Sequence, residues 1–139
     1  MNSLIKKLLR ESLKPKKIYA GCLIYCTTTD KFFLLHRNDP NPTWSLVSGG
    51  INEGETPLEG LKREIVEELS INPEIVKYEF VDTEITPNNK DGLFYYFKGY
   101  TTNEFKAKLD HENLSYGWFS MDELPEPLYP RFIDKLKSF

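Results

Sequence analysis

The residues that decide the fold are 49–71, and they read GGINEGETPLEGLKREIVEELSI. Thr56 is a candidate N-cap, Pro57 sits where a first-turn proline is tolerated, and Glu59 follows the cap by three residues, as in a capping box. Apolar side chains then recur at three- and four-residue steps, at positions 58, 61, 65 and 69. The pattern predicts an amphipathic helix over 57–70.

The same helix carries a cluster of acidic side chains. Glu64, Glu67 and Glu68 stand at i, i+3 and i+4, so they are neighbours on the helix surface. Three like charges on adjacent turns repel one another, and an ordinary solvated helix would mix lysines into this spacing. Hard divalent cations bind such oxygens, so the cluster indicates a metal-binding face.

This stretch resembles the signature of the Nudix hydrolases. That signature is a glycine, five residues, a glutamate, seven residues, and then Arg-Glu-apolar-any-Glu-Glu-any-Gly-apolar. The matching positions here are Gly49, Glu55, Arg63, Glu64, Ile65, Glu67, Glu68 and Ile71. The family glycine near the helix end is replaced by Ser70, and a positive φ at that serine would cost about 1 kcal/mol relative to glycine.

The pattern of elements by itself predicts an α+β fold, and the resemblance implies a Nudix-type α/β/α sandwich with a mixed β-sheet. We expect one domain over 1–139, in which residues 1–17 form an amphipathic helix (3–13) and a basic linker. The other expected elements are strands over 18–28, 32–36, 44–47, 75–85, 93–101 and 114–119, a turn over 87–92, a polar loop over 103–113, a helical turn over 121–124 and a closing helix over 131–139. Asn72-Pro73 is expected to end the central helix.

The resemblance also implies a cofactor, Mg²⁺ or Mn²⁺, held by Glu64, Glu67 and Glu68. A backbone oxygen of Gly49, or of Ser48 just before it, is expected to join them. Such ions neutralise charge on phosphate oxygens and lower the pKa of bound water.

Two further residues of the signature are expected to support these ligands. The resemblance implies that Arg63 orients a glutamate by ion pairing and that Glu55 braces the loop. A general base among the glutamates is also expected, without a choice between them.

An additional catalytic acid is expected from outside the signature. Glu112, six residues before Trp118, fits the family spacing best, and Asp110 and Glu84 are the alternatives. For each of them, a solvated loop charge is the competing interpretation.

Substrate contacts are less legible in the sequence. Arg37 is a candidate for a terminal phosphate, and Tyr96 and Tyr116 are candidates for stacking on a base. Trp44 is a comparable aromatic candidate. A surface position for Arg37 and core packing for the aromatic residues are the competing interpretations.

The formal net charge of −3 gives no general attraction to nucleic acid or to an anionic membrane, which argues against long nucleic acid as a partner. Cys22 and Cys26 are expected to be buried thiols on one face of a strand. The two histidines, His36 and His111, form no zinc constellation. No apolar run reaches the length of a membrane span, and a cytoplasmic location is expected.

The function predicted from these residues is hydrolysis of a nucleoside diphosphate linked to another moiety. The product would be a nucleoside monophosphate with pyrophosphate or a phosphorylated partner. A (d)NTP, a nucleotide sugar, a dinucleoside polyphosphate and a capped RNA stay open as substrates, and the small size of the chain favours a small nucleotide. The alternative is a catalytically inactive nucleotide-sensing or interaction module on the same scaffold, and the N-terminal helix could serve a homodimer.

Overall fold

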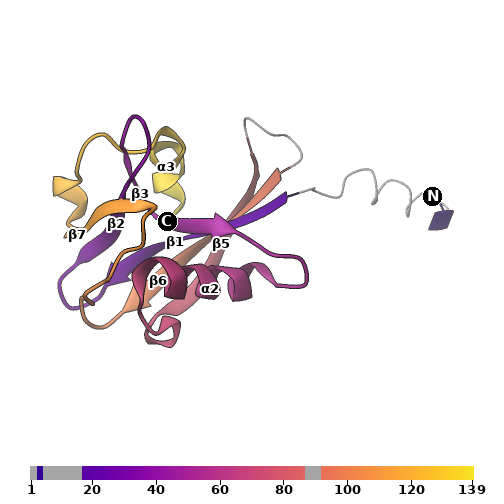
Figure 1. Ribbon diagram of the computed structural model, residues 1–139, viewed down its shortest axis with the longest axis horizontal. Coiled ribbons are helices and arrows are strands. Elements are labelled where there is room, and N and C mark those ends of the chain that lie inside the picture. Colours follow the sequence, from indigo (N-terminus) through magenta and orange to yellow (C-terminus); the bar gives the residue numbers. More distant parts are fainter. Residues whose placement is uncertain (1–2, 5–16, 87–91) are drawn as a thin grey trace.

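A computed structural model describes residues 3–4, 17–86 and 92–139. A mixed sheet lies between helix α2 (Pro57–Leu69) and helix α3 (Pro130–Lys135) (Figure 1). The strands are β1 (Lys17–Cys26), β2 (Lys31–Arg37), β3 (Trp44–Ser45), β4 (Val47–Gly50), β5 (Lys77–Ile85), β6 (Gly92–Thr101) and β7 (Asn113–Phe119). The predicted α+β sandwich is confirmed.

Strand β1 is the strand on which the sheet is assembled. Strand β6 runs parallel to it along its whole length. The other edge of β1 is shared, because β4 pairs with residues 19–22 and β2 pairs with residues 24–26. Strands β3 and β7 extend the sheet beyond β2, and β5 forms a hairpin partner of β6.

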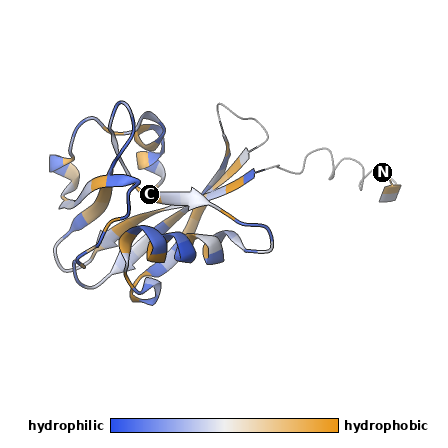
Figure 2. Ribbon diagram, viewed as in Figure 1, coloured by the Kyte–Doolittle hydropathy of each residue, from blue (hydrophilic) through white to orange (hydrophobic). Residues whose placement is uncertain are grey.

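The alternation of β1 divides the core between the two helices. Ala20, Cys22 and Ile24 pack in the cluster that contains the apolar stripe of α2, namely Leu61, Ile65 and Leu69. Leu23 points the other way, into a cluster with Phe132 of α3. Hydrophobic residues follow the strands, and hydrophilic residues mark much of α2 (Figure 2). Cys22 and Cys26 are buried free thiols, as predicted.

Helix α2 begins and ends as its side chains dictate. The Thr56 hydroxyl accepts from the Glu59 amide at 3.1 Å, and the Glu59 carboxylate accepts from the Thr56 amide at 3.1 Å, which is the predicted capping box. Ser70 adopts the left-handed conformation, with φ 55° and ψ 40°. The helix therefore ends at Leu69, and the prediction that Asn72-Pro73 ends it is wrong. The Asn72 side chain instead accepts from the Glu74 amide at the start of the short 3₁₀ helix η1 (Pro73–Ile75).

Other predicted boundaries differ for local reasons. The expected strand over 44–47 is divided between β3 and β4, which pair with different neighbours, β2 and β1. The closing helix is α-helical only as α3 and continues as the 3₁₀ helix η3 (Leu136–Ser138); the turn over 121–124 is the 3₁₀ helix η2 (Met121–Glu123). The loop over 103–113 is not simply polar, because Phe105, Ala107 and Leu109 pack against the α2 core. Most of the predicted N-terminal helix over 3–13 lies outside the described residues, and so does most of the predicted turn over 87–92.

Candidate active site

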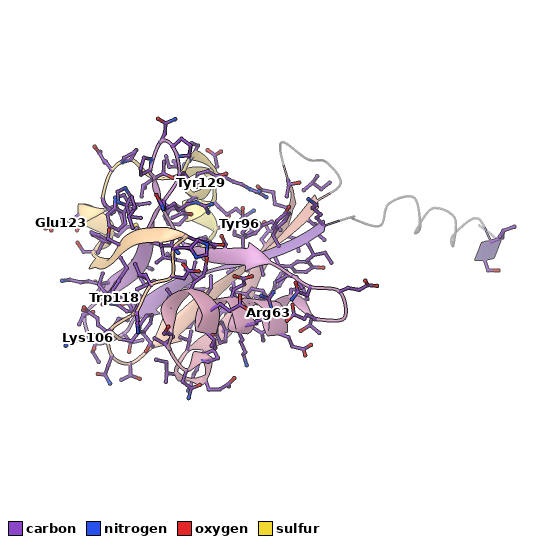
Figure 3. All side chains as sticks on the ribbon, viewed as in Figure 1. Arg63, Tyr96, Lys106, Trp118, Glu123 and Tyr129 are labelled. Atoms are coloured by element: carbon purple, nitrogen blue, oxygen red, sulfur yellow. The ribbon has the colours of Figure 1, made fainter. Side chains whose placement is uncertain are left out.

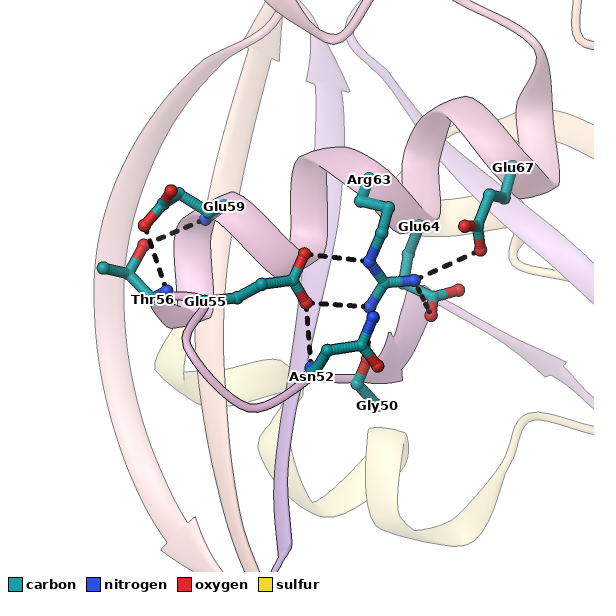
Figure 4. Close-up of polar contacts among 8 residues, drawn as sticks. All are labelled: Gly50, Asn52, Glu55, Thr56, Glu59, Arg63, Glu64 and Glu67. Atoms are coloured by element: carbon teal, nitrogen blue, oxygen red, sulfur yellow. Dashed lines mark hydrogen bonds and ion pairs between the residues drawn. The ribbon is translucent and has the colours of Figure 1, made fainter.

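Arg63, near the middle of α2, is the centre of a hydrogen-bonded network (Figure 4). Its guanidinium donates to both oxygens of Glu55, from Nε at 2.9 Å and from Nη2 at 3.1 Å. Nη2 also donates to the carbonyl of Gly50 at 2.8 Å, and Nη1 donates to Glu64 at 3.0 Å and to Glu67 at 3.2 Å. One cation thus ties the glycine loop to the helix and offsets part of the repulsion between two of the glutamates.

Glu55 and Glu64 each respond to this arginine. The Glu55 carboxylate also accepts from the Asn52 amide at 2.8 Å, and its pKa lies below its usual value, chiefly because of its bond to Arg63. Burial raises the pKa of Glu64, although Arg63 opposes that change. The predicted geometry, with Glu55 bracing the loop and Arg63 bonded to glutamates, is therefore present.

Gly49 lies directly against Glu64. A Cβ atom added at Gly49 would stand 2.3 Å from the Glu64 carboxyl carbon, far inside contact distance, whereas one added at Gly50 would meet nothing within 4 Å. Because only glycine leaves this space, the backbone of β4 and the Glu64 carboxylate are brought together where the sequence predicted a shared metal site.

The loop before β7 is joined to the end of α2 by backbone hydrogen bonds. The amide of Lys108 donates to the Leu69 carbonyl at 2.9 Å, and the amide of Asp110 donates to the Glu68 carbonyl at 3.3 Å. These bonds satisfy carbonyls that a helix end leaves free. They also place Asp110 and Glu112 beside Glu68, where one carboxylate oxygen of each residue lies within 4.8 Å of the others.

Glu68 is the most buried of the three signature glutamates. Glu68 is 5% exposed, and its Oε2 atom is buried without a hydrogen-bond partner in the described structure. Burial, followed by the neighbouring carboxyl groups of Glu112, Glu64 and Asp110, raises the pKa of Glu68 to about 9. A buried carboxylate surrounded by other carboxylates is unfavourable unless a cation joins it, so this donor set fits a hard divalent ion. Glu67 differs, since its side chain is 56% exposed.

A cavity of about 1010 Å³ opens next to this cluster. Ser48, Gly49, Glu68 and Glu112 line one part of it. Another part is lined by aromatic and charged residues of β1, β5, β6 and the α3 segment, namely Tyr19, Glu84, Phe94, Tyr96, Tyr129 and Arg131. Figure 3 shows Tyr96 and Tyr129 toward α3 and Arg63 on α2.

The sequence-predicted substrate residues are only partly brought together. Arg37 lines the cavity, donates to Asp39 at 2.8 Å and lies 5.7 Å from the ring centre of Tyr129. Tyr96 also lines the cavity but is 2% exposed and stacks on Phe94, so most of its surface is used in packing.

Other candidates lie away from the cavity lining. Tyr116 stacks on Phe33 in the α2 core and is not among the lining residues of the described chain, which gives it the packing role that the sequence held open. Trp44 stacks on His36. The cluster of possible metal ligands found among the described residues, Glu68, Asp110 and Glu112, contains no histidine.

Comparison with known families agrees with this geometry. The model of the NUDIX domain matches residues 15–138. The chain belongs to the Nudix hydrolase family. No helix in residues 3–4, 17–86 or 92–139 is both long and apolar enough to cross a membrane.

Two curated relatives and one solved structure illustrate the similarity of this Nudix chain. An RNA pyrophosphohydrolase of Helicobacter pylori (strain G27) is 37% identical over 93 residues, which are 61% of this chain and 56% of the relative. The dihydroneopterin triphosphate diphosphatase of Escherichia coli (strain K12) is 31% identical over 78 residues, which are 56% of this chain and 52% of the relative. This chain therefore spans about half the length of these relatives.

The MutT protein from Methanosarcina mazei Go1 is the structural example. It superposes with a TM-score of 0.67 at 26% identity, covering 86% of this chain and 88% of that one. The likeness extends far beyond the signature stretch and includes most of the sandwich.

Sequence reasoning missed two polar residues of the Nudix cavity. Asn113 and Arg131 each line the cavity and each have a buried side-chain nitrogen without a hydrogen-bond partner, Nδ2 and Nη2 respectively. Neither residue stands in a recognisable motif. Two weak signals were available: Asn113 directly follows Glu112, and an arginine stands at the start of the closing helix.

Proposed function

We propose that this chain is a divalent-metal-dependent pyrophosphohydrolase of a nucleoside diphosphate linked to another moiety. The observation that carries the proposal is the unpartnered, buried Glu68 oxygen beside Glu112 and Asp110, at one part of a cavity large enough for a nucleotide. The two curated relatives, which are named for diphosphate-releasing activities, support the same reaction class.

The roles of the chain's own residues follow from their places. Glu64, Glu67 and Glu68 would hold Mg²⁺ or Mn²⁺ with a backbone oxygen of Gly49 or Ser48, and the ions would supply charge neutralisation at the phosphates. Arg63 keeps two of these carboxylates in position and does not react. Glu112 lines the cavity and is our candidate to take the proton of the attacking water as the diphosphate P–O bond breaks.

The substrate class has two candidates within this reaction. A small nucleotide, such as a (d)NTP, a nucleotide sugar or a dinucleoside polyphosphate, fits the volume of the cavity and the net charge of −3. The similarity to the Helicobacter pylori protein favours RNA, which that relative's name gives as its substrate. We place the small nucleotide first, because long RNA is usually bound through many basic contacts.

The decisive experiment is hydrolysis of a panel with Mg²⁺ or Mn²⁺, containing the small nucleotides and an RNA oligonucleotide with a 5′-triphosphate. We expect turnover of at least one compound, which Glu67→Gln lowers by roughly 10²-fold, the scale of a lost electrostatic group in an active site. Glu67 is largely exposed, so the substitution should leave the fold intact.

Glu59→Gln is the matched control on the same helix, because glutamine also completes a capping box. It should retain the activity of the unchanged chain. Binding of nucleotides without turnover of any compound would contradict the proposed hydrolase activity and favour the inactive nucleotide-sensing module. A cytoplasmic location and a homodimer remain predictions beside this proposal.

A further inference from the structure

Arg131 has a buried donor that makes no hydrogen bond of good geometry in the described structure, although the Tyr96 hydroxyl lies close to its guanidinium. Its Nε donates to Glu84 at 2.9 Å, and its guanidinium lies 4.8 Å from the ring centre of Phe94. Its Nη2 atom is buried without a hydrogen-bond partner, although the residue lines the cavity. Leaving such a donor unpaired is unfavourable, so an acceptor that enters the cavity and reaches it would be bound favourably.

The surroundings of Arg131 favour an aromatic base over a phosphate group as the ligand at this end of the cavity. Phe94 stacks on Tyr96 at 4.4 Å and faces Tyr19 at 6.4 Å, with the rings of the latter pair inclined by only 17°. Aromatic faces of this kind suit a nucleobase, which stacks on such rings.

Carboxylates already offset the positive charges near Arg131. Lys135 donates to Asp82 at 2.8 Å and lies 3.3 Å from the second oxygen of Glu84. Asp134 also lines the cavity. Two cations therefore face three carboxylates, and a neutral acceptor fits this end better than an additional anion.

We propose that Arg131, held by Glu84 and stacked on Phe94, is a base-recognition subsite that distinguishes a purine with a 6-oxo group from adenine. The guanidinium donates to the base carbonyl, and the Glu84 carboxylate accepts the neighbouring ring N–H. Guanine and hypoxanthine offer this acceptor and donor side by side. Adenine carries an amino group in place of the oxygen, so two donors would oppose each other. Arginine also donates to the O6 atom of guanine in its commonest base-specific contact with DNA, although N7 is the second acceptor there.

This inference rests on the proposed function only in taking the ligand to be a nucleotide. It is therefore tested by binding, without turnover. We would titrate 5′-GMP, 5′-IMP and 5′-AMP into the full chain in EDTA, using calorimetry. All three carry the same phosphate, so a difference in affinity reports the base. We expect GMP and IMP to bind roughly tenfold more tightly than AMP.

Arg131→Met should reduce this preference to within about twofold, because the stem remains and the donors are lost. Arg131→Lys keeps the charge and should also lose most of the preference, since lysine lacks the planar fork. Lys98→Met is the matched control: it removes the same charge at a residue that contacts Tyr25 and Tyr100 and does not line the cavity. It should preserve the tenfold preference.

Three results would overturn the subsite. They are equal affinity for GMP and AMP, retention of the preference in both Arg131 variants, and no binding of any mononucleotide at millimolar concentration. Circular dichroism of the variants shows whether a lost preference reflects a lost fold. If Arg131→Met does not fold, the preference measured in Arg131→Lys tests the subsite. A chain that binds GMP selectively but hydrolyses nothing would keep the subsite and remove the proposed hydrolase activity.

Discussion

The glutamate end of the cavity and its Arg131 end draw on chain segments of very different span. Glu55, Arg63, Glu64 and Glu68 lie within a single loop and helix, to which the adjoining strand β4 and the loop before β7 contribute further groups. The Arg131 end instead combines β1, β5, β6 and α3, which are far apart in sequence. The groups proposed to react are thus specified locally, whereas the groups proposed to choose the substrate depend on the assembled sandwich.

This difference has a physical basis. Ligands at i, i+3 and i+4 of one helix keep their spacing whatever the rest of the fold does. Residues on separate strands keep their distances only through sheet register and packing. Changes at the first end should therefore alter the rate of reaction, and changes at the second should alter affinity and choice of base.

The largest effect should come from Glu68→Gln. Removing this buried carboxylate is expected to lower turnover by about 10³-fold, the upper scale for one lost electrostatic group. It should also reduce the rise in melting temperature that Mg²⁺ gives the unchanged chain. Thermal melts with Mg²⁺ and with EDTA measure the second effect; an undiminished Mg²⁺ shift would remove Glu68 from the ion site.

Gly49→Ala should have the next largest effect. The new methyl group would collide with the Glu64 carboxyl group, and misplacing a catalytic group by about 1 Å can cost roughly 10² in rate. Steady-state turnover of the best substrate in the panel measures the loss.

Gly50→Ala is its comparison, because a Cβ at that position meets nothing within 4 Å. The loss in this neighbour should be much smaller than at Gly49. Equal losses in the two variants would show that close approach to Glu64 is not what requires glycine.

At the other end, Phe94→Leu should weaken binding without a comparable change in kcat. The substitution keeps an apolar side chain but removes a stacking face, which is worth about 1–3 kcal/mol per base. We expect KM to rise by about tenfold, within that range. A fall in kcat with unchanged KM would place Phe94 with the reacting groups and break the division between the two ends.

The smallest effect should be a pH-dependent change in stability at Asp82. Its bond to Lys135 holds the pKa of Asp82 below the ordinary value of 3.8. The pair therefore contributes stability at neutral pH, and the contribution is lost as pH falls below 3.8 through the folded-state pKa. Asp82→Asn should melt slightly lower than the unchanged chain at pH 7, and the two curves should converge in acid.

Glu79→Gln, at an exposed position on the same strand, is the control for Asp82. It should change the melting temperature less than Asp82→Asn at pH 7. A difference at Asp82 that persists unchanged below pH 3.8 would contradict the contribution of this ion pair.

The signature helix could be predicted from the sequence nearly to the residue. Thr56, Glu59 and the apolar stripe act through local geometry, and Ser70 takes the left-handed conformation that its place in the signature required. The division of residues 44–50 between β3 and β4 was not predictable in this way. No local sequence signal within residues 44–50 indicates that the two halves of this segment pair with different strands.

The candidate site follows the same rule. Glu112 was chosen from spacing and does lie beside Glu68. Tyr116 was chosen for its chemistry, but its strand orients it into the α2 core. Arg131 was missed, because its unpaired nitrogen becomes visible only when α3 is packed next to β5 and β6.

The attachment of the loop before β7 to α2 has a consequence for how this family member can change. The two bonds from Lys108 and Asp110 to the helix use main-chain atoms alone. Substituting the side chains of that loop would leave both bonds available, provided that no proline removes an amide. Side-chain substitutions in the loop should therefore change the distance between Glu68 and Glu112 little. The loop can acquire new surface chemistry while these two carboxylates stay close together.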